Sequence, residues 1–194
     1  MAFKKIFLLS LPVLLMSSLS AQELVFNAYL GDDHIGTMTV TRTETASGVV
    51  YTSVTDITVT YILSMDLDLS YSAHYVDGQL TKTSFKYQRN HKTKEYSYGQ
   101  VKGSTFSTYF DDRTEHVLIK NINQTLTASY FAEPTQLNEV FSERWGVNIS
   151  LVSLGNSKYK ITLPDGKESY MTYANGLCRE SRIVSGWGDI VFRR

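Results

Sequence analysis

The chain has 194 residues, with 19 basic and 19 acidic side chains and a formal net charge of zero. This balance argues against a nucleic-acid-binding protein, which normally carries a concentrated basic face. A chain of this length is expected to form one domain with a substantial core.

The first residues have the features of a secretory signal peptide. Two lysines precede an apolar run that ends at Leu15, and a stretch of small residues follows,. The run is too short to serve as a permanent membrane anchor. We expect cleavage after Ala21, or after Ser20, so that residues 1–21 are removed and residues 22–194 form a single exported domain. We expect the mature protein to be soluble and periplasmic, or secreted.

Strands are expected from the beginning of the mature chain. Residues 24–30 and 35–43 read as a hairpin around a turn at residues 31–34,. Gly36 is expected at a bulge or at a point of close packing. The next strand is expected over residues 49–56.

The longest pattern in the chain runs from Ile57 to Tyr75. Every odd position is apolar or aromatic, and the even positions are mostly small, polar or charged. This period of two indicates extended chain with one face buried and one face in water. A single strand of this length would reach on the order of 60 Å. We therefore expect it to bend, or to turn near Ser64 through an odd number of residues, with odd positions inward on both sides.

The turn that ends at Gly78 sets the pairing of the following strand. A two-residue turn would place Leu69 opposite Lys86, an apolar side chain opposite a charged one,. A three-residue turn would pair Leu69 with Phe85 instead. We predict the three-residue turn, because a one-residue slip would expose the apolar set to water.

One short helix is predicted over residues 124–131. Asn121 or Asn123 would cap its beginning, and Pro134 lies just beyond its end,. We expect this helix to plug or cover one end of the sheet.

The rest of the chain is dominated by further strands, separated by turns rich in glycine, asparagine and aspartate,. They are expected over residues 93–101, 104–110, 115–119, 147–154, 158–163, 168–173, 177–184 and 190–193. So many strands in one domain must curl to bury their edges. The predicted fold is mainly β, an antiparallel and strongly curved sheet that forms a barrel or half-barrel, with the one short helix.

The sequence carries no recognisable catalytic or metal-binding motif. The four histidines are not spaced as ligands or catalytic partners, and the acidic pairs fall in predicted turns,. Cys178 is the single cysteine, and we expect it to be a buried, small apolar residue in a strand. We predict a protein that is not an enzyme and needs no metal or cofactor.

Two adjacent charges, Glu143 and Arg144, lie between Phe141 and Trp145. They could form a buried ion pair that anchors the polar head of a ligand. Alternatively they form an interior salt bridge that positions the helical segment, or they point to opposite faces of a strand. The thirteen tyrosines also have two possible roles. They could line a cavity for an amphipathic ligand, or they could pack between the sheet and the helix.

Our first hypothesis is that the curved sheet binds an apolar or amphipathic, lipid-like molecule on its inner face. The expected ligand-binding residues are Tyr61, Leu63, Met65, Leu67, Leu69, Tyr71, Tyr75, Glu143 and Arg144. The second hypothesis is an interaction module with a packed core and no ligand, which binds another envelope protein through an exposed edge or face. Neither hypothesis involves nucleic acid or a transmembrane segment in the mature chain.

Several short motifs together resemble a family of exported proteins of unknown function from Gram-negative bacteria. They are Tyr29-Leu30-Gly31 with Ile35-Gly36, Asp77-Gly78-Gln79-Leu80, Tyr130-Phe131 with Glu133-Pro134, Phe141 to Gly146, Leu163 to Gly166, and Tyr173 with Asn175-Gly176. The resemblance implies a curved β-sheet in an exported protein, and assigns no functional residue. More remotely, the strand pattern is similar to periplasmic half-barrels that carry lipoproteins or lipids.

Overall fold

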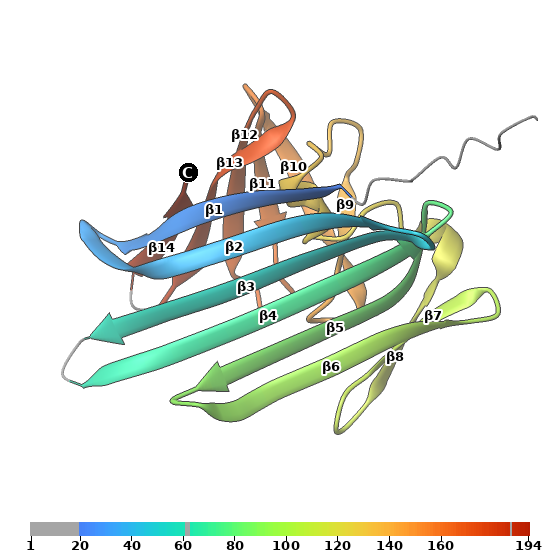
Figure 1. Cartoon of the computed structure of the whole chain (residues 1–194), viewed down its shortest axis with the longest axis horizontal. Helices are drawn as coiled ribbons and strands as arrows, with labels where there is room; N and C mark the ends of the chain where they lie inside the picture. Colours follow the sequence, from blue (N-terminus) through green and yellow to red (C-terminus); the bar gives the residue numbers. More distant parts are fainter. Residues whose placement is uncertain (1–19, 61–62, 187) are drawn as a thin grey trace, which may run out of the picture.

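A computed structural model describes residues 20–60, 63–186 and 188–194. These residues form one antiparallel sheet of 14 strands, in the order β8-β7-β6-β5-β4-β3-β2-β1-β14-β13-β12-β11-β10-β9 (Figure 1). The strands are β1 (Ala21–Leu30), β2 (Asp33–Thr45), β3 (Gly48–Thr60), β4 (Ser64–Val76), β5 (Gln79–Arg89), β6 (Lys92–Lys102), β7 (Thr105–Tyr109), β8 (Thr114–Leu118), β9 (Glu139–Ser142), β10 (Val147–Gly155), β11 (Lys158–Thr162), β12 (Glu168–Ala174), β13 (Leu177–Ser185) and β14 (Gly188–Arg193).

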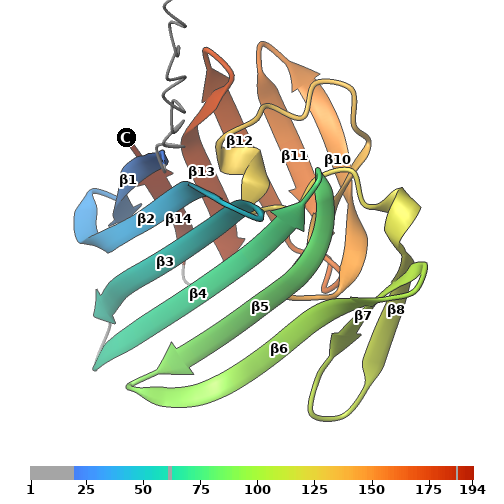
Figure 2. The ribbon, with the colours of Figure 1, turned by 45° about the vertical axis from the view of Figure 1, so that its right-hand side comes forward.

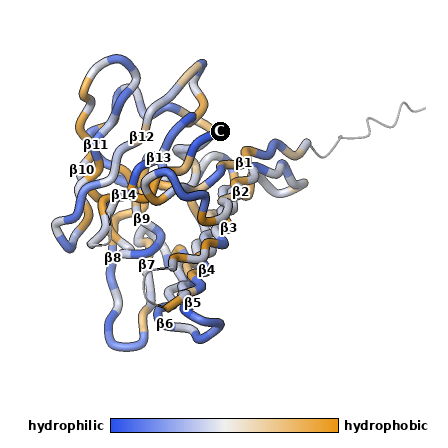
Figure 3. The backbone as a smooth tube through the Cα atoms, turned by 90° about the vertical axis from the view of Figure 1, so that its left-hand side faces the viewer, coloured by the Kyte–Doolittle hydropathy of each residue, from blue (hydrophilic) through white to orange (hydrophobic). Residues whose placement is uncertain are grey.

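The fold is mainly β, as predicted, but the sheet is not closed into a barrel. Its two end strands, β8 and β9, are not paired with each other in the described structure. Instead the sheet curves, so that β1 to β6 lie on one side and β10 to β14 on the other (Figure 3). The main core lies between these two sides and includes buried side chains such as Phe26, Ile57 and Phe192.

The predicted odd-length turn near Ser64 is confirmed. Thr60 pairs with Ser64, so three residues connect β3 and β4. An odd number of connecting residues keeps the same parity inward on both strands. Accordingly Val59 on β3 and Leu67 on β4 are both buried.

The turn between β4 and β5 has two residues, and the predicted three-residue turn is wrong. Val76 pairs with Gln79 on either side of Asp77 and Gly78. Both turn residues have positive φ angles, 50° and 75°. Such angles are typical of a type I′ hairpin turn, whose twist matches that of the strands it joins.

A β-bulge next to this turn restores the apolar pairing. Thr81 is the extra residue in β5, and its Oγ1 donates a hydrogen bond to the carbonyl oxygen of His74 (3.0 Å). Beyond the bulge Leu69 lies opposite Tyr87, and not opposite Phe85 as predicted. The bulge shifts the register by one residue, so the odd positions of β4 and β5 again share the inner face.

Gly36 lies at a bulge and at a close approach between strands, as predicted. The register of β1 and β2 shifts beside it, and its φ angle is 142°. A Cβ atom at this position would lie 2.2 Å from the carbonyl oxygen of Asp56 on β3. Only glycine allows the two backbones to come this close.

The helix predicted over residues 124–131 is wrong. Two short 3-10 turns are found in this region, η1 (Ile119–Asn121) and η2 (Ala128–Tyr130). Thr125 instead forms a parallel bridge with Phe141 on β9, a strand that the sequence analysis did not predict. The edge of β9 supplies backbone hydrogen bonds to this stretch, and β-branched threonine favours the extended form.

The residues between η1 and β9, numbers 122–138, cross the concave side of the sheet and are called here the inner segment (Figure 2). Three of its hydroxyl side chains, Thr125, Thr127 and Ser129, are almost fully buried. The ring of Tyr130 packs edge to face against Phe26 on β1, with ring centroids 5.6 Å apart. The inner segment is therefore part of the core.

Candidate functional site

A cavity of about 260 Å³ lies on the concave side of the sheet and is called here the interior cavity. Its 22 lining residues come from β2 to β5 on one side, from β11 to β14 with the β11–β12 turn on the other, and from the inner segment, the end of β9 and the β9–β10 connection. Twelve of them are apolar, six are serine or threonine, three are tyrosine, and one is Arg144. The result is an apolar chamber with scattered hydroxyl groups and one charged side chain.

Four of the residues predicted to bind a ligand line this cavity. Leu67, Leu69 and Tyr71 project into it from β4, and Arg144 reaches it from the β9–β10 connection. The alternating pattern of the sequence placed the three β4 residues on the inner face. Burial also raises the pKa of the Tyr71 hydroxyl above its ordinary value, so this group is neutral at physiological pH,.

Other predicted residues lie elsewhere. Met65 packs against the main core and is not among the residues that line the cavity. The side chain of Leu63 is 81% exposed, because it lies in the β3–β4 turn, so its assignment to the site is wrong. Tyr61 falls outside the described residues.

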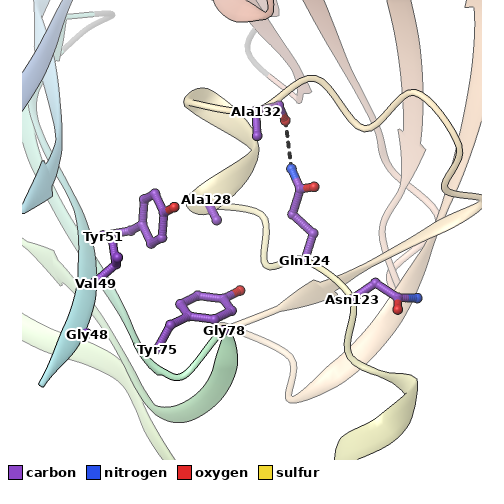
Figure 4. Close-up of a pocket in the computed structure, with 9 residues that line it drawn as sticks. All are labelled: Gly48, Val49, Tyr51, Tyr75, Gly78, Asn123, Gln124, Ala128 and Ala132. Carbon is purple, nitrogen blue, oxygen red and sulfur yellow. Dashed lines mark hydrogen bonds between the residues drawn. The ribbon is translucent and has the colours of Figure 1, made fainter. Parts of the chain in front are cut away.

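Tyr75 lines a second, more open hollow of about 270 Å³, called here the outer hollow (Figure 4). Its ring meets that of Tyr51 edge to face at 5.6 Å, and its hydroxyl accepts a hydrogen bond from the backbone N–H of Thr125 (3.0 Å). On the facing wall, Gln124 Nε2 donates to the carbonyl oxygen of Ala132 (2.7 Å). Tyr75 therefore helps to hold the inner segment and is not part of the interior cavity.

The inner segment separates the two spaces. Ala128 lines the outer hollow, whereas Thr127 and Tyr130 line the interior cavity. The Tyr130 hydroxyl also reaches Ser181 on β13 at 3.4 Å. One turn of chain thus forms a wall of both spaces.

Glu143 is fully buried but does not line the interior cavity. Its Oε1 accepts a hydrogen bond from the backbone N–H of Thr127 (3.0 Å), and its Oε2 has no partner within the described structure. Burial raises the pKa of this carboxyl group, while hydrogen bonds from Thr127 act in the opposite direction,. Its position fits an attachment point for the inner segment rather than a contact for a ligand.

Arg144 pairs with Glu95 on β6, and not with Glu143. Its Nη2 lies 2.7 Å from Oε2 of Glu95, and its Nε lies 3.1 Å from both carboxylate oxygens. The guanidinium also lies over the rings of Phe85 (5.4 Å) and Trp145 (5.0 Å),. Of the alternatives left open by the sequence, the pairing of the two neighbours with each other is therefore wrong, because their side chains leave the β9–β10 connection toward different partners.

The sequence analysis missed the wall of the cavity that lies opposite β4. Met171, Ser181 and Phe192 lie there, on β12, β13 and β14. The alternation in these strands, such as Met171 with Tyr173, predicts which of their side chains are buried. It does not predict which strands lie opposite them across the cavity, because that depends on how the whole sheet curves.

The single cysteine is buried, as predicted. Desolvation raises the pKa of the Cys178 thiol to about 12, so the reactive thiolate is strongly disfavoured,. Over residues 20–60, 63–186 and 188–194 no three His, Cys, Asp or Glu side chains are grouped to hold a metal ion. No helix in the same ranges is long and apolar enough to span a membrane.

Comparisons with known proteins place the chain at the level of a family. No curated protein and no solved structure matches it significantly. A family model described as a domain of unknown function (DUF6134) matches residues 26–194, which include most of the strands described above. The chain therefore belongs to the family of proteins that share this domain of unknown function, DUF6134.

Proposed function

We propose that this protein binds an apolar or amphipathic, lipid-like molecule in the interior cavity and catalyses no reaction. The observation that supports this proposal is the lining of the cavity, in which 12 of 22 side chains are apolar and only one is charged. Ligand pockets are typically apolar with a few well-placed polar groups. The proposal includes export to the periplasm by means of residues 1–21.

The size of the cavity favours a small ligand. Its volume of about 260 Å³ lies just below the usual range of ligand pockets, roughly 300–1,000 Å³,. A single hydrocarbon chain fits this space better than a lipid with two chains. The six serine and threonine residues and the three tyrosines offer hydrogen bonds to a polar head,.

The same lining argues for binding rather than catalysis. A hydroxyl nucleophile needs a neighbouring base, and no histidine, aspartate or glutamate is among the 22 lining residues,. We therefore assign the serine and threonine side chains to recognition.

Native mass spectrometry of protein purified from a periplasmic fraction tests the proposal. We expect an adduct of lipid-like mass, which denaturing extraction would release for identification. The adduct should disappear in Leu69→Gln, which puts an amide into the cavity wall, and should persist in Leu63→Gln, whose side chain is exposed. An unmodified mass for the wild-type protein, also after incubation with envelope lipids, would refute the proposal.

The edge of the sheet supports a second candidate function, the docking of another envelope protein. Within the described structure β8 ends the strand order, so it has a strand on one side only. Leu118 on this strand is 47% exposed. Exposed edges can accept a strand from a partner. Under this candidate, Leu118→Lys abolishes co-purification of one defined protein and leaves any lipid adduct unchanged.

A further inference from the structure

We propose that the interior cavity selects an uncharged amphiphile, such as the glycerol ester of a single hydrocarbon chain, and that the ion pair between Arg144 and Glu95 rejects charged head groups. This inference rests on the proposed function, because it names the class of molecule that the interior cavity would take.

The charge of the cavity wall is the first step. Arg144 is the one basic or acidic side chain among the lining residues, which are otherwise apolar side chains, serines, threonines and tyrosines. Its charge is already matched by Glu95, which contacts both Nε and Nη2 of the guanidinium at 2.7 to 3.1 Å. Paired in this way, the cavity presents almost no net charge to a ligand.

A charged head group would therefore meet an unfavourable partner. An anion beside Arg144 would lie next to the Glu95 carboxylate, and would have to compete for the same guanidinium,. A cation would meet Arg144 itself. Because both side chains are about 30% exposed, the repulsion is moderated by water but not removed,.

Arg144 is also held in place, so it cannot easily turn toward another partner. The ring of Phe85 lies 5.4 Å from the guanidinium and the ring of Trp145 lies 5.0 Å from it. The described hydrogen bonds to Glu95 use Nε and Nη2. The Nη1 group can still donate to a neutral oxygen, such as a hydroxyl or an ester carbonyl.

The other polar groups of the wall fit the same class of ligand. Ser53 and Thr55 on β3 and Ser169 on β12 are neutral side chains that both donate and accept hydrogen bonds,. They can recognise hydroxyl and ester groups along the wall. A carboxylate or an ammonium would lose its water there without gaining an opposite charge.

Three ligands with the same chain length test the proposal: 1-monolauroylglycerol, lauric acid and dodecylamine. They are titrated at neutral pH and below micellar concentrations, with tryptophan fluorescence in a Trp187→Phe background, so that Trp145 on the cavity wall is the one reporter. We expect the neutral ester to bind at least about tenfold more tightly than either charged ligand, a ratio that corresponds to ~1.4 kcal/mol.

Two variants should change this preference in opposite directions. Glu95→Gln leaves the charge of Arg144 unmatched, and lauric acid should gain about tenfold in affinity relative to the neutral ester. Arg144→Gln leaves the Glu95 carboxylate, and dodecylamine should gain instead. Glu115→Gln is the matched control, because it removes a β8 carboxylate that pairs with Arg113, away from both spaces, and should change no ratio.

The outcomes separate this inference from the function on which it rests. If none of the three ligands binds the wild-type protein, the proposed function fails and the inference fails with it. If lauric acid or dodecylamine binds as tightly as the ester, the cavity binds lipid but the selection by charge is refuted. If Glu95→Gln and Glu115→Gln change the relative affinity for lauric acid equally, selection by the Arg144–Glu95 pair is also refuted. The change would then follow from the loss of any one negative charge. Circular dichroism confirms that each variant is folded.

Discussion

Glu143 shows, at the scale of one residue, how a buried carboxyl group can hold a segment of chain. Its Oε1 binds the backbone N–H of Thr127, and the neighbouring titratable groups are the neutral hydroxyls of Tyr71, Tyr75 and Tyr130. Their pKa values are raised mainly by burial, and the charge of Glu143 adds to this effect. The sequence alone identified Glu143 as unusual, since charge between aromatic residues is rare, but its partner lies on another element.

This carboxyl group should make stability depend on pH in an unusual direction. Because the pKa of Glu143 is higher in the folded than in the unfolded chain, the folded state binds its proton more tightly,. Its contribution to the free energy of unfolding is full below the ordinary glutamate value of 4.5 and is lost as the pH rises through the raised pKa. Glu143→Gln should therefore gain stability relative to wild type as the pH rises above the ordinary glutamate value, measured by urea unfolding over a series of pH values,.

The control for this experiment is Glu44→Gln, which removes an exposed carboxylate on β2. It shows what the loss of one exposed carboxylate does by itself, and the pH dependence of Glu143→Gln should clearly exceed it. A difference between Glu143→Gln and wild type that does not change with pH would contradict the assignment.

The pairing of β4 with β5 shows, at the scale of the element, where a sequence pattern becomes ambiguous. The alternation correctly predicts that odd positions of both strands face inward. Either a three-residue turn or a two-residue turn followed by a bulge preserves this parity, and the structure has the second,. The helix prediction over residues 124–131 failed for a related reason, since the edge of β9 offers hydrogen bonds that the local sequence does not reveal.

Deletion of Thr81 tests the role of the bulge. Without this residue Lys82 follows Leu80 directly, so the strands keep their pairs and Leu69 stays opposite Tyr87. The deletion should therefore lower the urea midpoint only slightly. An alanine inserted after Thr81 instead moves the rest of β5 by one place, so that Leu69 faces Lys86 and the fully buried ring of Phe85 turns outward. Each large apolar side chain lost from the core costs about 1.5–3 kcal/mol, so we expect the insertion to unfold the protein or to lower its urea midpoint strongly. Thr81→Ala keeps the bulge and loses one hydrogen bond, with a cost of about 1 kcal/mol,. Equal effects of the insertion and the deletion would show that the bulge does not set the register.

The whole molecule is an open sheet whose curvature brings distant strands together around a cavity. β4 and β14 lie on opposite walls of this space although most of the chain separates them in sequence. A ligand in this position contacts both sides of the sheet and the inner segment at once. Binding should therefore stabilise the entire fold rather than one hairpin.

This coupling predicts a shift in global stability. A ligand that binds only the folded state at one hundred times its Kd raises the free energy of unfolding by about 2.7 kcal/mol. We expect 1-monolauroylglycerol to produce this shift in wild-type protein and in Leu63→Gln, and to produce none in Leu69→Gln, as measured by urea unfolding. A shift of the same size in Leu69→Gln would place the ligand outside the interior cavity.

The sequence by itself determined the positions of most strands and turns, the inward parity of the odd positions on β3 and β4, and the close packing at Gly36. These are local properties, because side-chain alternation and turn geometry depend on neighbouring residues. Only the tertiary structure decided that Arg144 pairs with Glu95, that residues 122–138 cross the core, and that β11 to β14 form the second wall of the cavity. Those contacts depend on the order and curvature of the whole sheet, which join residues far apart in the chain.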